Sequence, residues 1–321
     1  MIRLIALTSM ALAVPLTAGA FSLDVPVACM LGQDCYIQHG MDHDPGLGAS
    51  DFTCGTLTYD AHKGTDFALP SLAAQSAGVD VIAAASGVVR GVRSDMTDVL
   101  QGTPGAPDIN DRACGNGVVI GHDDGWETQY CHMKQDTITV QTGQIVSTGQ
   151  VLGQIGLSGN TEFPHLHLSV RHNGAAVDPF DPDGQITCGK TPTDSLWSEP
   201  VPFAPGGIVA AGFSATIPQY DAIKAGAAAR FRMSATAPNL VIWGYFFGGR
   251  AGDQVALSIH TAQGEVFADV QTLDRNQAQL FRAGGRRTPV GGWPHGDYSG
   301  SVRLIRDGKT LDTEAVSVTL N

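Results

Sequence analysis

Three short segments of the chain carry histidine and carboxylate side chains at spacings that suit a bound metal ion. Imidazole nitrogen and carboxylate oxygen are ligands that zinc takes at catalytic sites, where one coordination position stays open. Such a site activates water, so these residue types point to hydrolysis. The segments are His62-Lys63-Gly64-Thr65-Asp66, Gln129-Tyr130-Cys131-His132 and Pro164-His165-Leu166-His167.

The spacing within two of these segments places pairs of side chains on one side of the backbone. His165 and His167 are two residues apart, so on a strand both face the same way, about 6–7 Å from each other. His62 and Asp66 are four residues apart, and Gly64 favours a loop that leads into a strand over a helix. In that geometry both can face one cavity.

The sequence says less about the orientation and role of His132 and of the remaining histidines. His132 follows Tyr130 by two residues, so the pattern predicts that both face the same side of one strand. Spacing alone leaves open which of the four motif histidines bind the metal and which act as a base. The histidines without such a context are predicted to lie at the surface or in turns: His39, His43, His122, His172, His260 and His295.

The first 20 residues have the pattern of a secretory signal peptide. Arg3 supplies the positive charge, residues 4–16 are apolar but short for a membrane span, and residues 18–20 form a small-residue cleavage site. We therefore expect a mature chain from Phe21, exported to the periplasm or secreted. An uncleaved anchor is the alternative, and no later stretch is apolar enough to predict a membrane helix in the mature chain.

Cysteine content and charge narrow the class of protein. The six cysteines lie between Cys29 and Cys188, and an even number in an exported chain indicates disulfides. None has the close spacing of a zinc knuckle. The net charge of −12, without basic and aromatic runs, speaks against nucleic acid as a partner. The sequence allows many pairings, of which we expect Cys29–Cys35, Cys54–Cys188 and Cys114–Cys131.

Short β signals dominate the first part of the chain, which we place at residues 21–189. It begins with an irregular segment at 29–50, and residues 93–112 form a long surface loop of the kind that often rims a functional groove. A hairpin is expected across 117–132. Strands are predicted at 79–82, 87–90, 117–120, 126–132 and 166–170.

A proline-rich linker at 190–207 is expected to lead to a second domain at 208–321. Its strong β patterning, with an Asp307-Gly308 hairpin turn, predicts a β-sandwich. The fold class is thus mainly β: an antiparallel sheet domain followed by a C-terminal β-sandwich. The strands of this second domain are predicted at 240–247, 255–260, 301–305 and 313–320.

The histidine-bearing segments together resemble the M23 family of zinc metallopeptidases, the lysostaphin/LytM-type peptidoglycan endopeptidases. The resemblance covers about residues 53–179 and includes the runs at 114–122, 149–153 and 177–179. It implies an antiparallel catalytic sheet with an open groove. It also implies that His62, Asp66 and His167 hold Zn²⁺, while His132 and His165 polarise the water and stabilise the oxyanion. Weaker candidates for substrate contacts are Asn116, Tyr130 and Asn160.

The function expected from these features is hydrolysis of peptide bonds in bacterial peptidoglycan by a zinc endopeptidase. Two alternatives stay open: a non-catalytic regulator of another wall hydrolase on the same fold, and a secreted zinc peptidase acting on Gly-rich proteins. The second domain lacks site-type residues, so we expect it to be dispensable for chemistry and to bind wall, position the enzyme or act as a structural module. Oligomeric state is left open.

Overall fold

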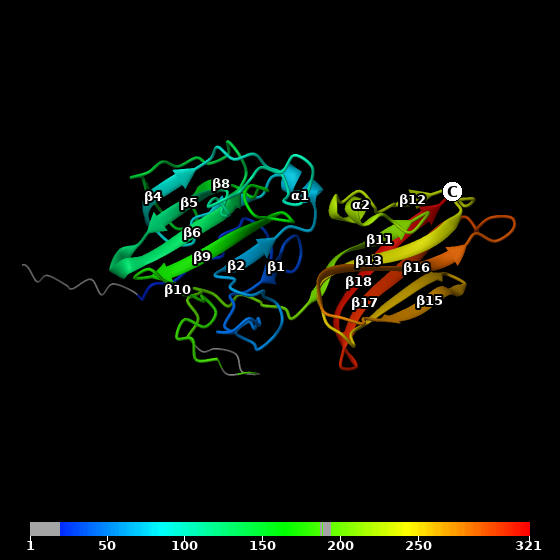
Figure 1. The fold of residues 1–321 in the computed structure, drawn as a ribbon. Coiled ribbons are helices and arrows are strands. Elements are labelled where there is room, and N and C mark those ends of the chain that lie inside the picture. The colour runs from blue at the N-terminus through cyan, green and yellow to red at the C-terminus, as the bar shows by residue number, and fades with distance from the viewer. Residues whose placement is uncertain (1–19, 187, 189–193) are drawn as a thin grey trace, which may run out of the picture.

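The computed structural model describes residues 20–186, 188 and 194–321, and Figure 1 shows two bodies of β structure side by side. Nearly all of the expected signal peptide, and residues 190–193 of the expected linker, lie outside the described residues. Within the described part, none of the helices is long and apolar enough to cross a membrane. The mainly β fold class is confirmed.

The first body is built on one antiparallel sheet in the order β1-β2-β9-β6-β5-β4-β7, with β10 paired to β9. A separate pair, β3 and β8, and the short helix α1 complete it. The elements are β1 (Tyr36–His39), β2 (Thr65–Ala68), α1 (Leu72–Ala77), β3 (Asp80–Ile82), β4 (Gly87–Arg93), β5 (Asn116–Gly121), β6 (Trp126–Met133), β7 (Ile145–Val146), β8 (Val151–Gln154), β9 (His165–His172) and β10 (Ala175–Val177).

Alternation along the central strands separates a core face from a polar face. Leu166, Leu168 and Val170 of β9 are fully or almost fully buried in one apolar cluster, together with residues of β5 and β6. Because successive side chains of a strand point to opposite faces, His165 and His167 lie on the other face. The apolar face thus fixes the sheet and leaves the histidines in position for chemistry.

Some elements differ from the sequence predictions. The expected hairpin forms, since β5 and β6 pair antiparallel. The segment expected to be irregular at 29–50 instead contains β1, which pairs with β2 at the sheet edge. This strand was missed because it has four residues and includes the polar Gln38 and His39. In the long loop that follows β4, Met96 is buried, so the loop is anchored in place.

The second body consists of two sheets that face each other across an apolar core. One has the order β11-β13-β16 and the other β12-β18-β17-β14-β15. Ile242 and Phe246 of β13 pack in the same cluster as Leu257 of β14 and Val302 of β17, as in a sandwich. The elements are β11 (Gly207–Ser214), α2 (Tyr220–Lys224), β12 (Arg232–Met233), β13 (Asn239–Gly249), β14 (Gln254–Thr261), β15 (Gly264–Thr272), β16 (Gln277–Arg287), β17 (Gly296–Arg306) and β18 (Lys309–Leu320).

Covalent and apolar contacts tie the first body together. All three expected disulfides, Cys29–Cys35, Cys54–Cys188 and Cys114–Cys131, are confirmed. Trp197 falls within the predicted linker, yet its side chain is buried in the apolar cluster of the first body and it bridges to Leu23. The described part of that segment is therefore packed, because an indole of this size gains more from burial than from exposure.

Candidate metal centre

The structure brings the three expected metal ligands together on the polar face of the sheet. Asp66 Oδ1 lies 3.2 Å from His62 Nε2 and 2.9 Å from His167 Nδ1. The two imidazole nitrogens are 3.0 Å apart. One ligand atom from each residue thus falls within 4.8 Å of the others. The set of two imidazoles and one carboxylate is the mixed donor set of a catalytic zinc.

Strand pairing and one glycine explain why these residues meet. In the antiparallel pairing of β2 with β9, Asp66 stands opposite His167. The loop that carries His62 must pass close to β9. A Cβ atom at Gly64 would lie 2.6 Å from His167 Nε2 and 2.5 Å from the Leu168 carbonyl oxygen. Only glycine therefore allows this approach.

Hydrogen bonds behind the ligands fix which nitrogen each ring presents. His62 Nδ1 lies 2.6 Å from the Gly40 carbonyl oxygen, so Nδ1–H donates there and the lone pair of Nε2 faces the centre. His167 Nε2 lies 2.9 Å from Ser169 Oγ, which leaves Nδ1 facing the centre. Two lone pairs and a carboxylate oxygen converge on one point. The residues present fit a metal ion, and such backing partners orient metal ligands.

The charges in the centre support a ligand role for Asp66. Burial disfavours its charged form, but the neighbouring imidazoles of His62 and His165 and the close contacts with His167 and His39 hold its pKa well below its usual range. For His62, burial works against protonation, yet the Asp66 carboxylate outweighs it and raises the pKa of His62. The site is therefore built around a negative charge that attracts cations.

The two other motif histidines lie beside the centre, and both rings have the same tautomer. His132 Nδ1 is 2.8 Å from the Ser158 carbonyl oxygen, and His165 Nδ1 is 2.9 Å from the Phe163 carbonyl oxygen. Each ring donates through Nδ1–H and keeps Nε2 free of a proton. Burial lowers the pKa of His132 well below its usual range, helped by His165 and His167, and burial lowers that of His165 to about 4. Both rings are therefore neutral near pH 7.

A break in strand geometry turns His132 toward this site. Its φ is +61°, and the β6–β9 pairing ends one residue earlier, at Cys131. The prediction that His132 and Tyr130 share one face is therefore wrong. Tyr130 is fully buried, and its hydroxyl accepts from the Ala84 backbone N–H at 2.8 Å. Positive φ at a residue other than glycine is strained, and such strain concentrates at functional sites.

Two of the predicted substrate contacts, Tyr130 and Asn116, are fully buried. Neither side chain is open to a substrate, so these two predictions are wrong. Asn116 is fully buried, accepts from the Met96 N–H at 2.8 Å and donates to the Met96 and Met133 carbonyl oxygens. It therefore ties the long loop to the end of β6. Asn160 is exposed, so its substrate contact stays a prediction.

His39 is the site residue that sequence reasoning missed. It was expected at the surface or in a turn, but it is 8% exposed, and its Nδ1 lies 3.1 Å from Asp66 Oδ2. The pairing of β1 with β2 sets His39 opposite Asp66. No local signal marks it, because a single histidine in a four-residue strand has no motif. His43 is also not a free surface residue, since its Nε2 lies 2.7 Å from Asp178 Oδ2.

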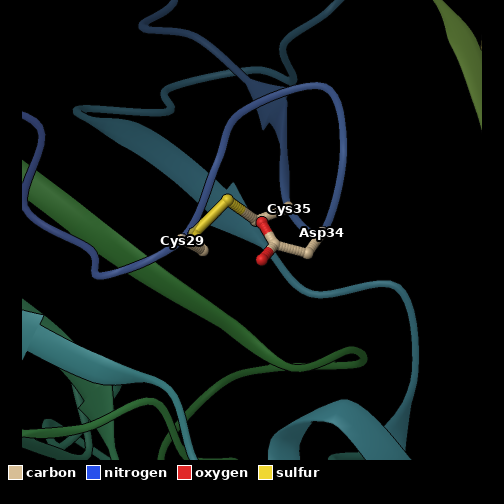
Figure 2. Close-up of side chains that lie close together, drawn as sticks. All are labelled: Cys29, Asp34 and Cys35. Carbon is tan, nitrogen blue, oxygen red and sulfur yellow. A yellow bond between two sulfur atoms is a disulfide. The ribbon is translucent and has the colours of Figure 1, made fainter.

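Two other groupings of possible ligands differ from this centre. Figure 2 shows Asp34 beside Cys29 and Cys35, whose sulfurs are bonded to each other as a disulfide and so are not thiolate ligands. Asp34 Oδ1 accepts from the Met30 N–H at 2.6 Å. The other grouping consists only of carboxylates, two of them exposed: Asp181, Asp183 and Asp194. Neither has the imidazole ligands of the centre on β2 and β9.

The donor set of this centre is one that zinc hydrolases use, and the family comparison covers all three of its residues. The model of peptidase family M23 matches residues 60–179. The resemblance seen in the sequence is thereby confirmed, and the chain carries an M23 peptidase domain. β1 with His39, the Gly40 carbonyl and the whole second body lie outside the matched residues.

Individual relatives match a stretch of the chain of similar length. The DD-carboxypeptidase/endopeptidase Mpg of Neisseria meningitidis serogroup B is 33% identical over 122 residues, which is 38% of this chain and 23% of that protein. The peptidoglycan DD-endopeptidase ShyB of Vibrio cholerae is 34% identical over 122 residues, with the same coverage of 38% and 23%. The chain thus spans about a quarter of the length of these relatives.

Among solved structures, the catalytic domain of the prophage-encoded M23 protein EnpA from Enterococcus faecalis is 26% identical to this chain. The match covers 54% of this chain and 100% of that one, with a TM-score of 0.34.

Proposed function

We propose that this chain is an exported zinc endopeptidase that hydrolyses peptide bonds in bacterial peptidoglycan. The observation that carries the proposal is the convergence of His62, Asp66 and His167, with ligand atoms within 4.8 Å of one another. The family match supports a metallopeptidase. The similarity to the peptidoglycan DD-endopeptidase ShyB of Vibrio cholerae supports the substrate class. The amino-terminal pattern and three disulfides support export.

In this proposal His62, Asp66 and His167 hold the ion and the two neutral histidines handle protons. When bound, zinc supplies a Lewis acid that makes water nucleophilic near neutral pH. His132 and His165 keep Nδ1–H on backbone carbonyls, so Nε2 of either ring is free to take a proton from the attacking water. The protonated ring then becomes a donor. It can stabilise the negative charge that develops on the scissile carbonyl oxygen and return the proton to the leaving amine.

Digestion of two different polymers distinguishes between the candidate substrates. The zinc-loaded mature chain is incubated with purified peptidoglycan and, separately, with a Gly-rich elastic protein, and released fragments are identified by mass spectrometry. The proposal predicts new peptide ends from the peptidoglycan stem or cross-link. Cleavage of the Gly-rich protein alone would favour a peptidase acting on proteins. A folded chain that binds no zinc and cuts neither polymer would favour a regulator of another hydrolase.

A further inference from the structure

The strand β1 contains one extra residue, Gln38, beside the candidate metal centre. In the pairing of β1 with β2, Ile37 stands opposite Phe67, and His39 stands opposite Asp66. The register thus shifts by one residue at Gln38, as in a β-bulge. In an unshifted ladder Gln38, and not His39, would stand opposite Asp66. The extra residue therefore decides which side chain meets this proposed metal ligand.

The side chain of Gln38 is held by the C-terminal body. It is fully buried, and a buried amide needs hydrogen-bond partners. Its Nε2 donates to the Ala278 carbonyl oxygen at 3.0 Å, and its Oε1 accepts from Gln279 Nε2 at 2.9 Å. Both partners belong to β16. The two bodies of the molecule are thus joined at the extra residue of β1.

The direction of these hydrogen bonds follows from the chemistry of their partners. The Ala278 carbonyl oxygen can only accept, so Gln38 turns its NH2 group toward it and its oxygen toward Gln279. Gln279 must then present its own NH2 group, which also donates to the Tyr36 hydroxyl at 3.2 Å. Its Oε1 accepts from the Tyr245 hydroxyl at 2.6 Å. A side chain of the same shape that cannot donate would therefore break the link to Gln38.

The link continues from Gln38 to the metal centre through the next residue along the chain. His39 is buried, and its Nδ1 lies 3.1 Å from Asp66 Oδ2. The other carboxylate oxygen, Oδ1, faces the two imidazole ligands His62 and His167. His39 therefore contacts the oxygen that these two ligands leave free. A partner on that oxygen orients the carboxylate for a metal ion.

We propose that Gln279 is a positioning residue that acts through Gln38 to place His39 against the metal centre. A slip of β1 to the unshifted register would pull Gln38 away from β16 and leave buried polar groups without partners, which is costly. The inference rests on the proposed function, in which Asp66 is a metal ligand. The C-terminal body then supports the metal centre, against the expectation that it is dispensable for chemistry.

The test measures the zinc affinity of full-length variants by competition with a chelator. Gln279→Glu keeps the shape of the side chain but sets a carboxylate oxygen against Gln38 Oε1, and Gln279→Ala removes the contact without adding charge. Both should weaken zinc binding several-fold, less than the roughly 10- to 100-fold expected for loss of His39 itself. Gln263→Glu, an exposed glutamine in the turn between β14 and β15, is the matched control and should bind zinc like the wild type.

Two further measurements separate positioning from a general loss of stability. The double variant of His39→Ala with Gln279→Glu should bind zinc no more weakly than His39→Ala alone, because both changes act on one route. With cobalt in place of zinc, the visible absorption reports the arrangement of the ligands. His39→Ala and Gln279→Glu should shift that absorption in the same way, and Gln263→Glu should leave it unchanged.

The outcomes separate this inference from the function on which it rests. Wild-type zinc affinity in Gln279→Glu would overturn the inference, and so would a double variant in which the two losses multiply. If the wild type binds zinc but cleaves no peptidoglycan, the proposed function fails, and the affinities still decide the inference. If the wild type binds no zinc, cross-strand nuclear Overhauser contacts in the metal-free protein decide it. Loss of the contact between residues 39 and 66 in Gln279→Glu would support the inference, and its retention would overturn it.

Discussion

His39 Nδ1 and Asp66 Oδ2 lie 3.1 Å apart across the pairing of β1 with β2. The family match begins at residue 60, so this contact joins a strand outside the match to a proposed ligand inside it. The same strand leads into Gly40, whose carbonyl oxygen accepts from His62 Nδ1. The N-terminal segment therefore backs two of the three proposed metal ligands.

The first prediction concerns the contact of His39 with Asp66. His39→Ala should weaken zinc binding about 10- to 100-fold, the usual cost of losing a partner that orients a ligand. His39→Gln should restore part of the affinity, because its amide can donate to Asp66. Competition with a chelator measures the dissociation constant, and His295→Ala, an exposed histidine, is the control. Unchanged affinity in His39→Ala would show that β1 does not support the centre.

The second prediction separates the catalytic histidines from the ligands. His132→Ala and His165→Ala should each bind zinc nearly as tightly as the wild type. Each should lose roughly two or more decades of kcat, the scale of general-base or oxyanion help. Zinc content by mass spectrometry and single-turnover rates are measured on the same samples. Loss of zinc from either variant would make that histidine a ligand.

The centre could be predicted from sequence where local spacing defines it. His165 and His167 alternate on one strand, and their face follows from period two alone. Asp66 stands opposite His167 because β2 pairs with β9, about a hundred residues later in the chain. Local spacing cannot predict this pairing, and only the family resemblance indicated that the two residues share one site. His39 was missed for the same reason, because its neighbours are set by non-local pairing.

Backbone irregularity and exposure account for the other misses. The expected side of His132 was wrong because its positive φ breaks the alternation, and no glycine announces such a break. In the C-terminal body β13 was predicted from its apolar run, and it is buried along most of its length. The strands β15 and β16 were not predicted, because many of their side chains are exposed or partly exposed and give no apolar signal.

The third prediction is a pH-dependent contribution to stability from His43. Burial opposes protonation, but the hydrogen bond and charge of Asp178, helped by Asp181 and Asp42, raise the pKa of His43 above its ordinary 6.5. A raised folded-state pKa stabilises fully below the unfolded value and is lost as pH rises through the folded value. The gap in unfolding free energy between wild type and His43→Gln should be largest below about pH 6.

Urea unfolding at several pH values measures that gap. It should narrow steadily above pH 6.5, because the wild type then loses the charged pair that the variant never had. His295→Gln serves as the control and should follow the wild type at every pH. A gap that widens with rising pH would mean that His43 is neutral in the folded state.

The fourth prediction ranks two disulfides by the loops that they close. Cys54–Cys188 spans a sequence separation of 134 and Cys114–Cys131 one of 17. Chain entropy assigns about 4–5 kcal/mol to the longer loop and about 3 kcal/mol to the shorter. Paired Cys→Ala variants should lose stability in that order in non-reducing urea titrations. The reverse order would mean that folded-state contacts outweigh the loop term.

Metal-dependent hydrolysis at the centre on β2 and β9 is the central claim about this protein. The measurement is zinc content together with cleavage of a cross-linked peptidoglycan peptide by the wild type and by His167→Ala. His172→Ala, a histidine at the end of the same strand, is the control. The account predicts one zinc per chain and cleavage for the wild type and the control, and neither for His167→Ala. Retention of stoichiometric zinc or of cleavage by a folded His167→Ala would contradict it.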